Sequence, residues 1–481
     1  MRRTLAVLGV LILLLGTYAV LDAYDKVPGI LTMAPPPVRA TTAPTSPAPS
    51  VALPSPATGG PLKAAGATGP LPASARLAAR LDPVLTDPAL AAGVGVVVRD
   101  GTTGEVLFTH DPATPRTPAS SLKLVSALAV TETLDMSRTM TTRVVRGASH
   151  GEIILVAGGD TLLARGAGNP LATVGHAGLG DLARQVATAL TAEGTPSVRL
   201  RLDLSYAAGP AYPATWDRRD LENGLTQTVR MIGLADDRPD PVLGRVAPAD
   251  PPASVATAFV RALAADSVTA TLEPRSGWDV AAPAGAATLG SVESAPYADV
   301  LADCLVDSDD ALMENLARQA SVAAGGTASA ADVVALVERV LTRFAIPTTG
   351  SVILDASGLT HGQRVTPTLV SDVLLVGSTG RSPAFAAALA ALPVAGLTGT
   401  LAADQERFVT AATHLVAGVP RAKTGTLIGT AALAGTTVDA DGRLLDFVID
   451  ADHVPATPGG TSGARGALDH FATVLTQCGC S

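Results

Sequence analysis

Hydrophobic positions in two widely separated parts of the chain follow the pattern of β-strands. Runs rich in β-branched and aromatic side chains occupy residues 94–98, 105–109, 421–437 and 443–450. The first two runs flank the segment Asp-Gly-Thr-Thr-Gly, and the last two flank Asp-Ala-Asp-Gly. Both segments are rich in turn-forming residues. The pattern therefore predicts one β-hairpin near each end of the chain.

Segments with helical character lie between and beyond these hairpins. They occupy residues 75–81, 120–134, 297–306, 311–323 and 463–477. Pro83 and Pro88 follow the first of them, which predicts that this helix ends before Pro83. Strands from both ends of the chain that flank a helical middle indicate an α+β domain whose sheet is assembled from both termini.

The stretch from residue 141 to residue 285 differs from its flanking segments in its mixture of predicted strands, a helix and proline-rich loops. Its predicted elements are strands at 153–156 and 198–204, a helix at 181–192 and proline-rich loops at 239–252. We interpret residues 141–285 as an inserted region of one or two small domains. Residues 74–140 and 286–481 then form a single domain around it.

The N-terminal segment has the charge pattern of an export signal. Arg2 and Arg3 precede an uncharged run that ends at Leu21, and acidic residues follow it. Residues 1–25 are therefore predicted to be a signal peptide or a membrane anchor, and both alternatives place the rest of the chain outside the cytoplasm. Residues 26–73 are rich in Pro, Ala and Thr and are predicted to be a disordered linker that acts as a spacer.

Composition and charge exclude several classes of function. The formal net charge of −9 and the lack of a basic cluster argue against a nucleic-acid partner. No spacing of Cys and His residues suggests a metal site, and no cofactor is predicted. Cys304, Cys478 and Cys480 are too few for a disulfide framework, and the single residue between the last two would strain a bond between them. The oligomeric state is left open.

Lysine is rare in this chain, and its positions point to chemistry. The 481 residues contain lysine only at positions 26, 63, 123 and 423. Ser120 lies three residues before Lys123, so the two side chains share one face of the predicted helix. A neutral amine beside a hydroxyl can activate that hydroxyl as a nucleophile. The alternative is a helix cap followed by a solvated lysine.

Two later segments carry further candidate residues. Ser308-Asp309-Asp310 lies between two predicted helices, where Ser308 either points into a cleft or caps the second helix. Lys423 begins the run Lys-Thr-Gly-Thr at the start of a predicted strand. Its amine and the neighbouring hydroxyls can bind a carboxylate; the alternative is an edge-strand lysine that prevents aggregation.

The order of the three segments resembles a known set of motifs. Ser-x-x-Lys, then Ser-Asp-Asn, then Lys-Thr-Gly is typical of penicillin-binding proteins and class A β-lactamases. Four more segments resemble the D-alanyl-D-alanine carboxypeptidase/endopeptidase family, the class C low-molecular-mass penicillin-binding proteins. They are Pro-Ala-Ser-Ser-Leu-Lys-Leu at 118–124, Leu-Val-Ala-Gly-Gly-Asp at 155–160, Asp-Ala-Ser-Gly-Leu at 355–359 and Leu-Pro-Val-Ala-Gly-Leu-Thr-Gly-Thr-Leu at 392–401.

The resemblance implies a fold and an activity. The fold is α+β, a serine β-lactamase/penicillin-binding-protein-like transpeptidase domain, and the family carries its inserted domains between the first two motifs. The implied enzyme is a serine-type D-alanyl-D-alanine carboxypeptidase, with endopeptidase action as a second activity. Its substrate is the peptidoglycan stem peptide, and β-lactam antibiotics are its covalent inhibitors. It belongs in the cell envelope, at the outer face of the cytoplasmic membrane through the N-terminal segment, or secreted.

The resemblance also implies roles for single residues. Ser120 attacks the carbonyl between two terminal D-alanines, Lys123 takes its proton, and Ser308 relays a proton to the departing amine. Lys423 and the hydroxyls of Thr424 and Thr426 receive the terminal carboxylate. The backbone N–H groups of Ser120 and Thr426 form the oxyanion hole.

Gly425, within the same substrate-binding run, is expected to let a ligand approach the backbone closely.

One position departs from the family pattern. Asp310 stands where the motif has asparagine, whose amide both donates and accepts hydrogen bonds. An ionised Asp310 only accepts, and it can hold Lys123 protonated. The alternative function is therefore a catalytically weakened or inactive peptidoglycan-binding protein of the same fold.

Two other features receive structural interpretations. Gly-Ala-Ser-His-Gly at 147–151 matches the nucleophile elbow of α/β-hydrolases, but a strand follows it instead of a helix, which predicts a hairpin turn. The charged residues Asp404, Glu406 and Arg407 are interpreted as a solvated turn.

Overall fold

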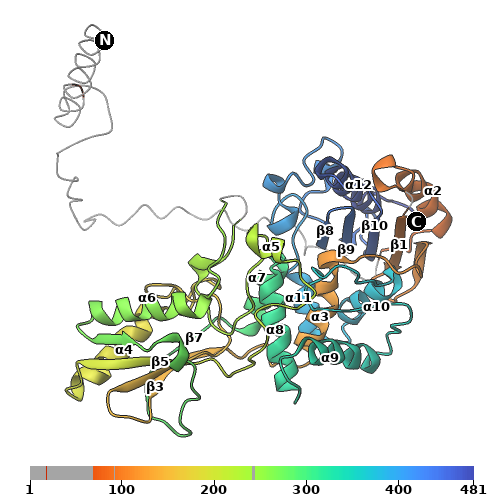
Figure 1. The fold of residues 1–481 in the computed structure, drawn as a ribbon. Coiled ribbons are helices and arrows are strands. Elements are labelled where there is room, and N and C mark those ends of the chain that lie inside the picture. Colours follow the sequence, from red (N-terminus) through yellow and green to blue (C-terminus); the bar gives the residue numbers. More distant parts are fainter. Residues whose placement is uncertain (1–17, 19–68, 92, 241–243) are drawn as a thin grey trace, which may run out of the picture. The chain divides into compact units, whose positions relative to one another are not determined.

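The computed structural model describes residue 18 and residues 69–91, 93–240 and 244–481 (Figure 1). The predicted signal peptide or anchor lies outside the described residues except for Tyr18, as does the linker up to residue 68. The folded body falls within one compact unit, Lys63–Ser481, and is described by itself.

The first sheet joins the two ends of the folded body. Its antiparallel strands run in the order β2-β1-β10-β9-β8. They are β1 (Gly93–Asp100), β2 (Val106–His110), β8 (Arg421–Leu427), β9 (Thr430–Val438) and β10 (Leu444–Asp452). Both predicted hairpins are confirmed. The predicted run 421–437 is two strands instead of one, because the chain turns at Ile428 and Gly429, where Gly429 has a φ of +85°.

The sheet buries both of its faces. Successive side chains of a strand point to opposite faces, so Leu433 and Phe447 belong to one core while Ala434 and Val448 belong to another. The first core is closed by α2 (Ser74–Leu85) and α12 (Pro458–Thr476), and the second by α3 (Leu122–Thr131) and α10 (Pro367–Ser378). Figure 1 shows these helix pairs on opposite sides of β8–β10.

The first helix does not end before Pro83. The helix α2 includes Pro83 and continues to Leu85. Val84 is 5% exposed and packs in the same core as Leu77 and Leu81. Tertiary burial of Val84 thus outweighs the helix-breaking tendency of Pro83 at the last turn.

A helical subdomain packs against the second face of the sheet. Besides α3 and α10 it contains α7 (Tyr297–Asp307), α8 (Asp310–Ala323), α9 (Ala330–Arg343) and α11 (Pro383–Ala390). Among the described residues, no single helix has both the length and the apolar character to cross a bilayer. Only α10 and α11 meet that test together, as a pair bent by 105°.

The inserted region has its own sheet and core. The strand order is β6-β5-β4-β3-β7, with β4, β5 and β6 parallel to one another. The strands are β3 (Thr141–Arg146), β4 (Glu152–Val156), β5 (Ser197–Asp203), β6 (Thr269–Leu272) and β7 (Thr288–Glu293). The helices α4 (Leu179–Ala192) and α6 (Pro251–Ala265) pack in its core, and α5 (Arg218–Glu222) belongs to its loops.

Two predictions about this region can be compared with the structure. Residues 147–151 join β3 to β4 as an antiparallel hairpin, which confirms that this segment is a turn and not a nucleophile elbow. The predicted boundary at residue 285 is too early. Because β7 pairs with β3, residues up to Glu293 belong to the second sheet.

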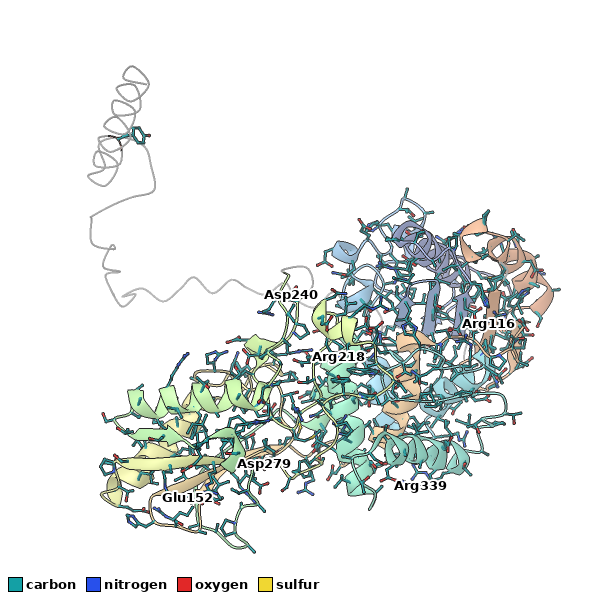
Figure 2. The ribbon with its side chains drawn as sticks, in the orientation of Figure 1. Arg116, Glu152, Arg218, Asp240, Asp279 and Arg339 are labelled. Atoms are coloured by element: carbon teal, nitrogen blue, oxygen red, sulfur yellow. A yellow bond between two sulfur atoms is a disulfide. The ribbon has the colours of Figure 1, made fainter. Side chains whose placement is uncertain are left out.

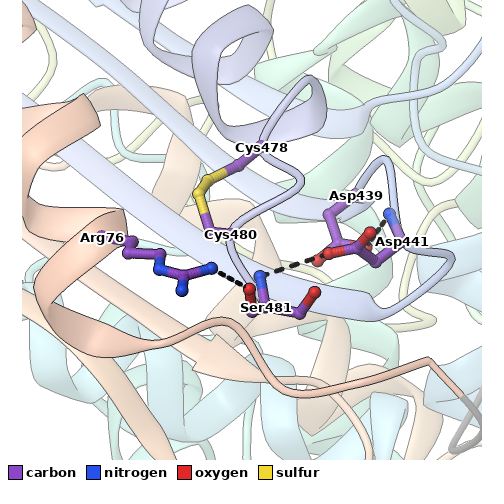
Figure 3. The surroundings of a disulfide bond; sticks show 6 residues. All are labelled: Arg76, Asp439, Asp441, Cys478, Cys480 and Ser481. Atoms are coloured by element: carbon purple, nitrogen blue, oxygen red, sulfur yellow. Dashed lines mark hydrogen bonds between the residues drawn. A yellow bond between two sulfur atoms is a disulfide. The ribbon is translucent and has the colours of Figure 1, made fainter.

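The C-terminus contains a disulfide that the spacing argued against. Cys478 and Cys480 are joined, with Cα atoms 5.1 Å apart, within the range that a disulfide spans (Figure 3). Arg76 donates a hydrogen bond to the Ser481 carbonyl, and the Ser481 N–H donates to Asp441 Oδ2 at 3.3 Å. These contacts tie the C-terminus to α2 and to the turn before β10.

The strand β10 carries a buried acidic residue, Asp450. Neither of its side-chain oxygens has a hydrogen-bond partner among the described residues, and burial raises the pKa of Asp450 to about 7. Arg116, which lies beside β1 in Figure 2, opposes this shift but donates instead to Asp452 at 2.8 Å and to the Val94 carbonyl at 2.9 Å. Asp450 therefore favours its neutral form in the folded protein.

We expect Asp450→Asn to stabilise the protein at alkaline pH. The folded-state pKa of Asp450 lies above its usual 3.8, so its stabilising contribution is present below pH 4 and is lost as the pH rises through about 7. The variant should raise the melting temperature at pH 8 by roughly 2 °C or more and change it little at pH 4. The exposed Asp266→Asn is the control, and equal shifts at both pH values would contradict the prediction.

Candidate active site

Ser120 and Lys123 lie at the start of a buried helix. A 3₁₀ turn, Ala119–Ser121, leads directly into α3. Residues three apart share a helix face here, and Lys123 Nζ lies 2.9 Å from Ser120 Oγ. Lys123 is 0% exposed, and Ser120 makes no side-chain cap. The alternative of a helix cap followed by a solvated lysine is therefore wrong.

The amine of Lys123 has three hydrogen-bond acceptors. Besides Ser120 Oγ, they are the Ser357 carbonyl at 2.8 Å and Asp310 Oδ1 at 2.5 Å. An ammonium has three N–H donors, so the protonated form of Lys123 is fully satisfied. A neutral amine donates only two hydrogen bonds and keeps a lone pair for the proton of Ser120.

Asp310 is the first residue of α8 and faces Lys123. Burial raises the pKa of Asp310, and the attraction of Lys123 only partly offsets this. The nearby carboxylates of Asp309 and Asp355 raise it further. The sequence raised the possibility that Asp310 approaches Lys123, and the structure brings the two side chains together.

Ser308 occupies the junction between α7 and α8. It ends α7 in the left-handed region, with a φ of 61°. The N-cap of α8 is Asp309, whose Oδ1 accepts from the Leu312 N–H at 2.8 Å, so Ser308 does not cap that helix. Ser308 Oγ instead accepts a hydrogen bond from Lys423 Nζ at 2.8 Å.

Lys423 is buried within β8. Although β8 is the edge strand of the first sheet, Lys423 is 0% exposed, which contradicts the interpretation as a solvated edge lysine. Its amine also donates to the Thr424 carbonyl at 2.9 Å. Burial lowers the pKa of Lys423 well below its usual value, and the neighbouring charge of Lys123 lowers it further.

The segment 355–359 holds the Ser357 carbonyl in place. Asp355 accepts hydrogen bonds from the Gly358 N–H at 2.8 Å and the Thr360 N–H at 2.9 Å. Trp216 of the inserted region donates to the same carboxylate at 3.0 Å. Gly358 has a φ of +91°, and a Cβ there would lie 1.9 Å from the Ala119 carbonyl oxygen. Only glycine allows this segment to pack against the turn that carries Ser120.

Glu314 is a buried residue that the sequence did not single out. Its Oε1 accepts from the Ala356 N–H at 2.7 Å and the Ser357 N–H at 3.0 Å. Burial raises the pKa of Glu314 to about 8. Glu314 thus supports, from α8, the backbone whose carbonyl contacts Lys123. In the sequence it is visible only as the first residue of the segment Glu-Asn-Leu-Ala-Arg at 314–318, which resembles the residues that follow the middle motif in the family, and no role was predicted for it.

Four of the candidate residues line one small cavity of about 200 Å³, while the amines of Lys123 and Lys423 lie behind its two serines. Its lining residues are Ser120, Ser308, Thr400, Gln405, Arg407, Thr424, Thr426 and Arg465. The three motif segments, which long stretches of sequence separate, therefore each contribute to the lining of one space. Gly425 does not line it: a Cβ at Gly425 would lie 2.6 Å from the Pro118 carbonyl oxygen. The close approach at Gly425 is made by the protein's own backbone.

The prediction of a solvated turn is wrong for Arg407. The side chain is 2% exposed and forms a bidentate ion pair with Asp469 of α12, with Nε 2.9 Å from Oδ1 and 3.0 Å from Oδ2. The partner lies 62 residues further along the chain, so only the tertiary structure reveals the pair. Among the described residues, no cluster of His, Cys, Asp and Glu could hold a metal ion.

Comparison with known proteins gives a consistent result. The model of the D-Ala-D-Ala carboxypeptidase 3 (S13) family matches residues 77–238 and 233–473. A carboxypeptidase of Mycobacterium tuberculosis is 33% identical over 416 residues, which are 85% of this chain and 86% of that protein. A D-alanyl-D-alanine carboxypeptidase of an Actinomadura species is 27% identical, covering 79% of this chain and 81% of that protein.

A solved structure shares the fold. The crystal structure of penicillin binding protein 4 from Haemophilus influenzae aligns with a TM-score of 0.65 at 17% sequence identity. The alignment covers 82% of this chain and 98% of that one. The predicted penicillin-binding-protein-like fold is thereby confirmed.

Proposed function

The chain belongs to the D-Ala-D-Ala carboxypeptidase 3 (S13) family and is a serine-type D-Ala-D-Ala carboxypeptidase, and from this premise we propose which residues carry the reaction. The observation that supports the proposal is the meeting of Ser120, Lys123, Ser308 and Lys423 through hydrogen bonds beside one cavity. Serine, an amine base and a second hydroxyl suffice for an acyl-enzyme cycle.

Acylation begins at Ser120. Its Oγ attacks the carbonyl between the two terminal D-alanines of a stem peptide, while its proton passes to the neutral amine of Lys123. The backbone N–H groups of Ser120 and Thr426 donate to the oxygen that becomes negative in the tetrahedral intermediate. The C–N bond then breaks, and an ester forms on Ser120.

The departing amine needs a proton. Ser308 lies between Lys423 and the cavity, and its hydroxyl gives a proton to the leaving nitrogen. Ser308 regains a proton from Lys423, whose lowered pKa makes it a competent donor. Water later attacks the ester, and its proton passes through Ser308 back to Lys423. Lys123 returns its proton to the Oγ of Ser120 as the ester bond breaks, and the shortened peptide leaves as its carboxylic acid.

Asp310 does not prevent this cycle, because the Lys123–Asp310 pair can hold one proton in two ways. If the proton moves from Lys123 to Asp310, an ammonium and a carboxylate become an amine and a carboxylic acid with the same total charge. Burial raises the pKa of Asp310 and so brings this neutral pair closer in free energy to the ion pair. A protonated Asp310 also has an O–H donor, as the asparagine amide of the motif does.

Asp310→Asn tests this account. The change removes the carboxylate that stabilises the ammonium form of Lys123, so Lys123 acts as a base at lower pH. We expect the acidic limb of the pH profile of penicillin acylation to move to lower pH, with acylation at pH 6 rising roughly 10-fold. The measurement is the second-order acylation rate from pH 5 to pH 9. An unmoved acidic limb would show that Asp310 does not control the base.

The same variant separates the enzyme from the alternative function. The short contact between Lys123 and Asp310 is the observation that favours a weakened, peptidoglycan-binding protein. In that case the native chain shows no acylation by a fluorescent penicillin, while Asp310→Asn acquires it. Labelling of the native chain supports the enzyme.

Two finer features also belong to the proposal. We propose that β-lactams acylate Ser120 and that the enzyme cleaves cross-links as well as terminal D-alanine. A digest of purified muropeptides, followed for released D-alanine and for lost cross-links, measures both activities. We further propose that residues 1–25 hold the body at the outer face of the cytoplasmic membrane. Fractionation of cells that express the full chain, compared with a chain lacking residues 1–25, tests that placement.

A further inference from the structure

One wall of the cavity is cationic, and the motif residues do not form it. Arg407 and Arg465 line the same cavity as Ser120 and Thr426. Asp469 neutralises Arg407 through the bidentate ion pair. Among the described residues, no carboxylate lies within ion-pair distance of Arg465. The one hydrogen bond that its guanidinium makes to a described residue goes to the Gln405 carbonyl at 2.8 Å. Arg465 therefore brings to the cavity a positive charge that no lining carboxylate pairs with, and the nearby Glu406, whose charge also acts on it, lies outside the lining.

The donors of the Lys-Thr-Gly-Thr segment are largely occupied. The hydroxyl of Thr424 donates to Thr400 Oγ1 at 2.8 Å, so its one hydrogen does not reach a ligand. Lys423 uses two of its N–H donors on Ser308 and on the Thr424 carbonyl. Thr426 is exposed and remains available. A carboxylate in this cavity needs more donors than Thr426 supplies.

Arg465 is suited to supply them. Half-buried on α12, it presents a guanidinium with several N–H donors in a fixed plane, which matches the two oxygens of a carboxylate. Asp469 lies one helical turn after Arg465 on α12 and forms the ion pair with Arg407. This ion pair fixes the part of α12 that carries Arg465 beside the cavity.

We propose that Arg465 binds the α-carboxylate of the amino acid that leaves from the scissile bond. Arg407 and Asp469 are positioning residues for it. This inference rests on the proposed function and makes Arg465 a specificity residue. Substrates that end in a free carboxylate are preferred over those in which the same group is a neutral amide.

The test compares two substrates with two enzymes. One substrate is an acylated dipeptide that ends in D-Ala-D-Ala with a free carboxylate, and the other is its C-terminal primary amide. We expect Arg465→Gln to lower kcat/KM for the acid by roughly 10- to 100-fold, through KM more than kcat, and to leave kcat/KM for the amide within about 3-fold. Arg465→Lys should recover part of the preference for the acid, because it restores the charge without the planar donor pair.

The controls separate the possible failures. Arg80→Gln removes an exposed arginine of α2 and should leave the acid-to-amide ratio unchanged. An equal loss on acid and amide in Arg465→Gln would overturn the carboxylate assignment and leave a structural role. If Arg465→Gln fails to fold, as seen in its melting curve, Arg465→Lys alone decides, since an unchanged ratio there contradicts the role of the planar donors. A native chain that cleaves neither substrate and binds no penicillin would count against the proposed function itself.

Discussion

Ser120→Ala is expected to abolish both acylation by penicillin and release of D-alanine, with a loss of at least about 1000-fold in kcat/KM. The reason is that Ser120 Oγ is the only hydroxyl of the described residues that Lys123 contacts. Ser308 Oγ accepts from Lys423, and Ser121 Oγ donates to the Pro118 carbonyl at 2.7 Å, away from the cavity. The readouts are a fluorescent-penicillin gel and a D-alanine assay on the same preparation.

Ser121→Ala is the matched control for that variant. Its hydroxyl is buried and makes one local hydrogen bond, so its loss should cost about 1 kcal/mol of stability and leave acylation intact. Persistent labelling of Ser120→Ala would mean that another residue is the nucleophile, and the proposed cycle would have to be abandoned.

Lys123→Met is expected to have the second-largest effect, again roughly 1000-fold on acylation. Methionine fills a similar volume but offers no lone pair of comparable basicity to the proton of Ser120. The change also leaves Asp310 without the cation that lies 2.5 Å away, so the variant should lose roughly 3 kcal/mol of stability where Asp310 is ionised.

The double variant Lys123→Met with Asp310→Asn separates the two effects. It removes both charges, so its melting temperature should return toward that of the native protein. Acylation should stay absent, because the base is still missing. Recovery of acylation in the double variant would show that Lys123 serves only to neutralise Asp310.

Much of the fold follows from local patterns. The hairpins 94–109 and 430–452 have alternating or continuous apolar runs around turn residues, and neighbouring strands along the chain paired as expected. The inserted region is also recognisable in the sequence, because its strands, helix and proline-rich loops differ from the flanking helical segments. Its end at Glu293 was missed, because the pairing of β7 with β3 joins segments that are distant in sequence and carries no local signal.

Some residues of the candidate site could be predicted from the sequence, and others could not. Ser120 and Lys123 are neighbours on a helix, so their contact could be inferred from their spacing alone. Glu314, Asp469 and Arg465 could not be found in this manner. The contacts of each side chain are with groups from other parts of the chain, and these contacts form only when the separate elements pack together.

The sequence by itself determined the order of the three motifs, the two hairpins and the departure at Asp310, because each depends on residue types at short spacing. Only the tertiary structure decided that Lys123 touches Asp310, that Lys423 is buried, and that Arg407 pairs with Asp469. Burial and the distance between charges set the protonation states and ion pairs of such groups, and both quantities arise when separate elements pack together.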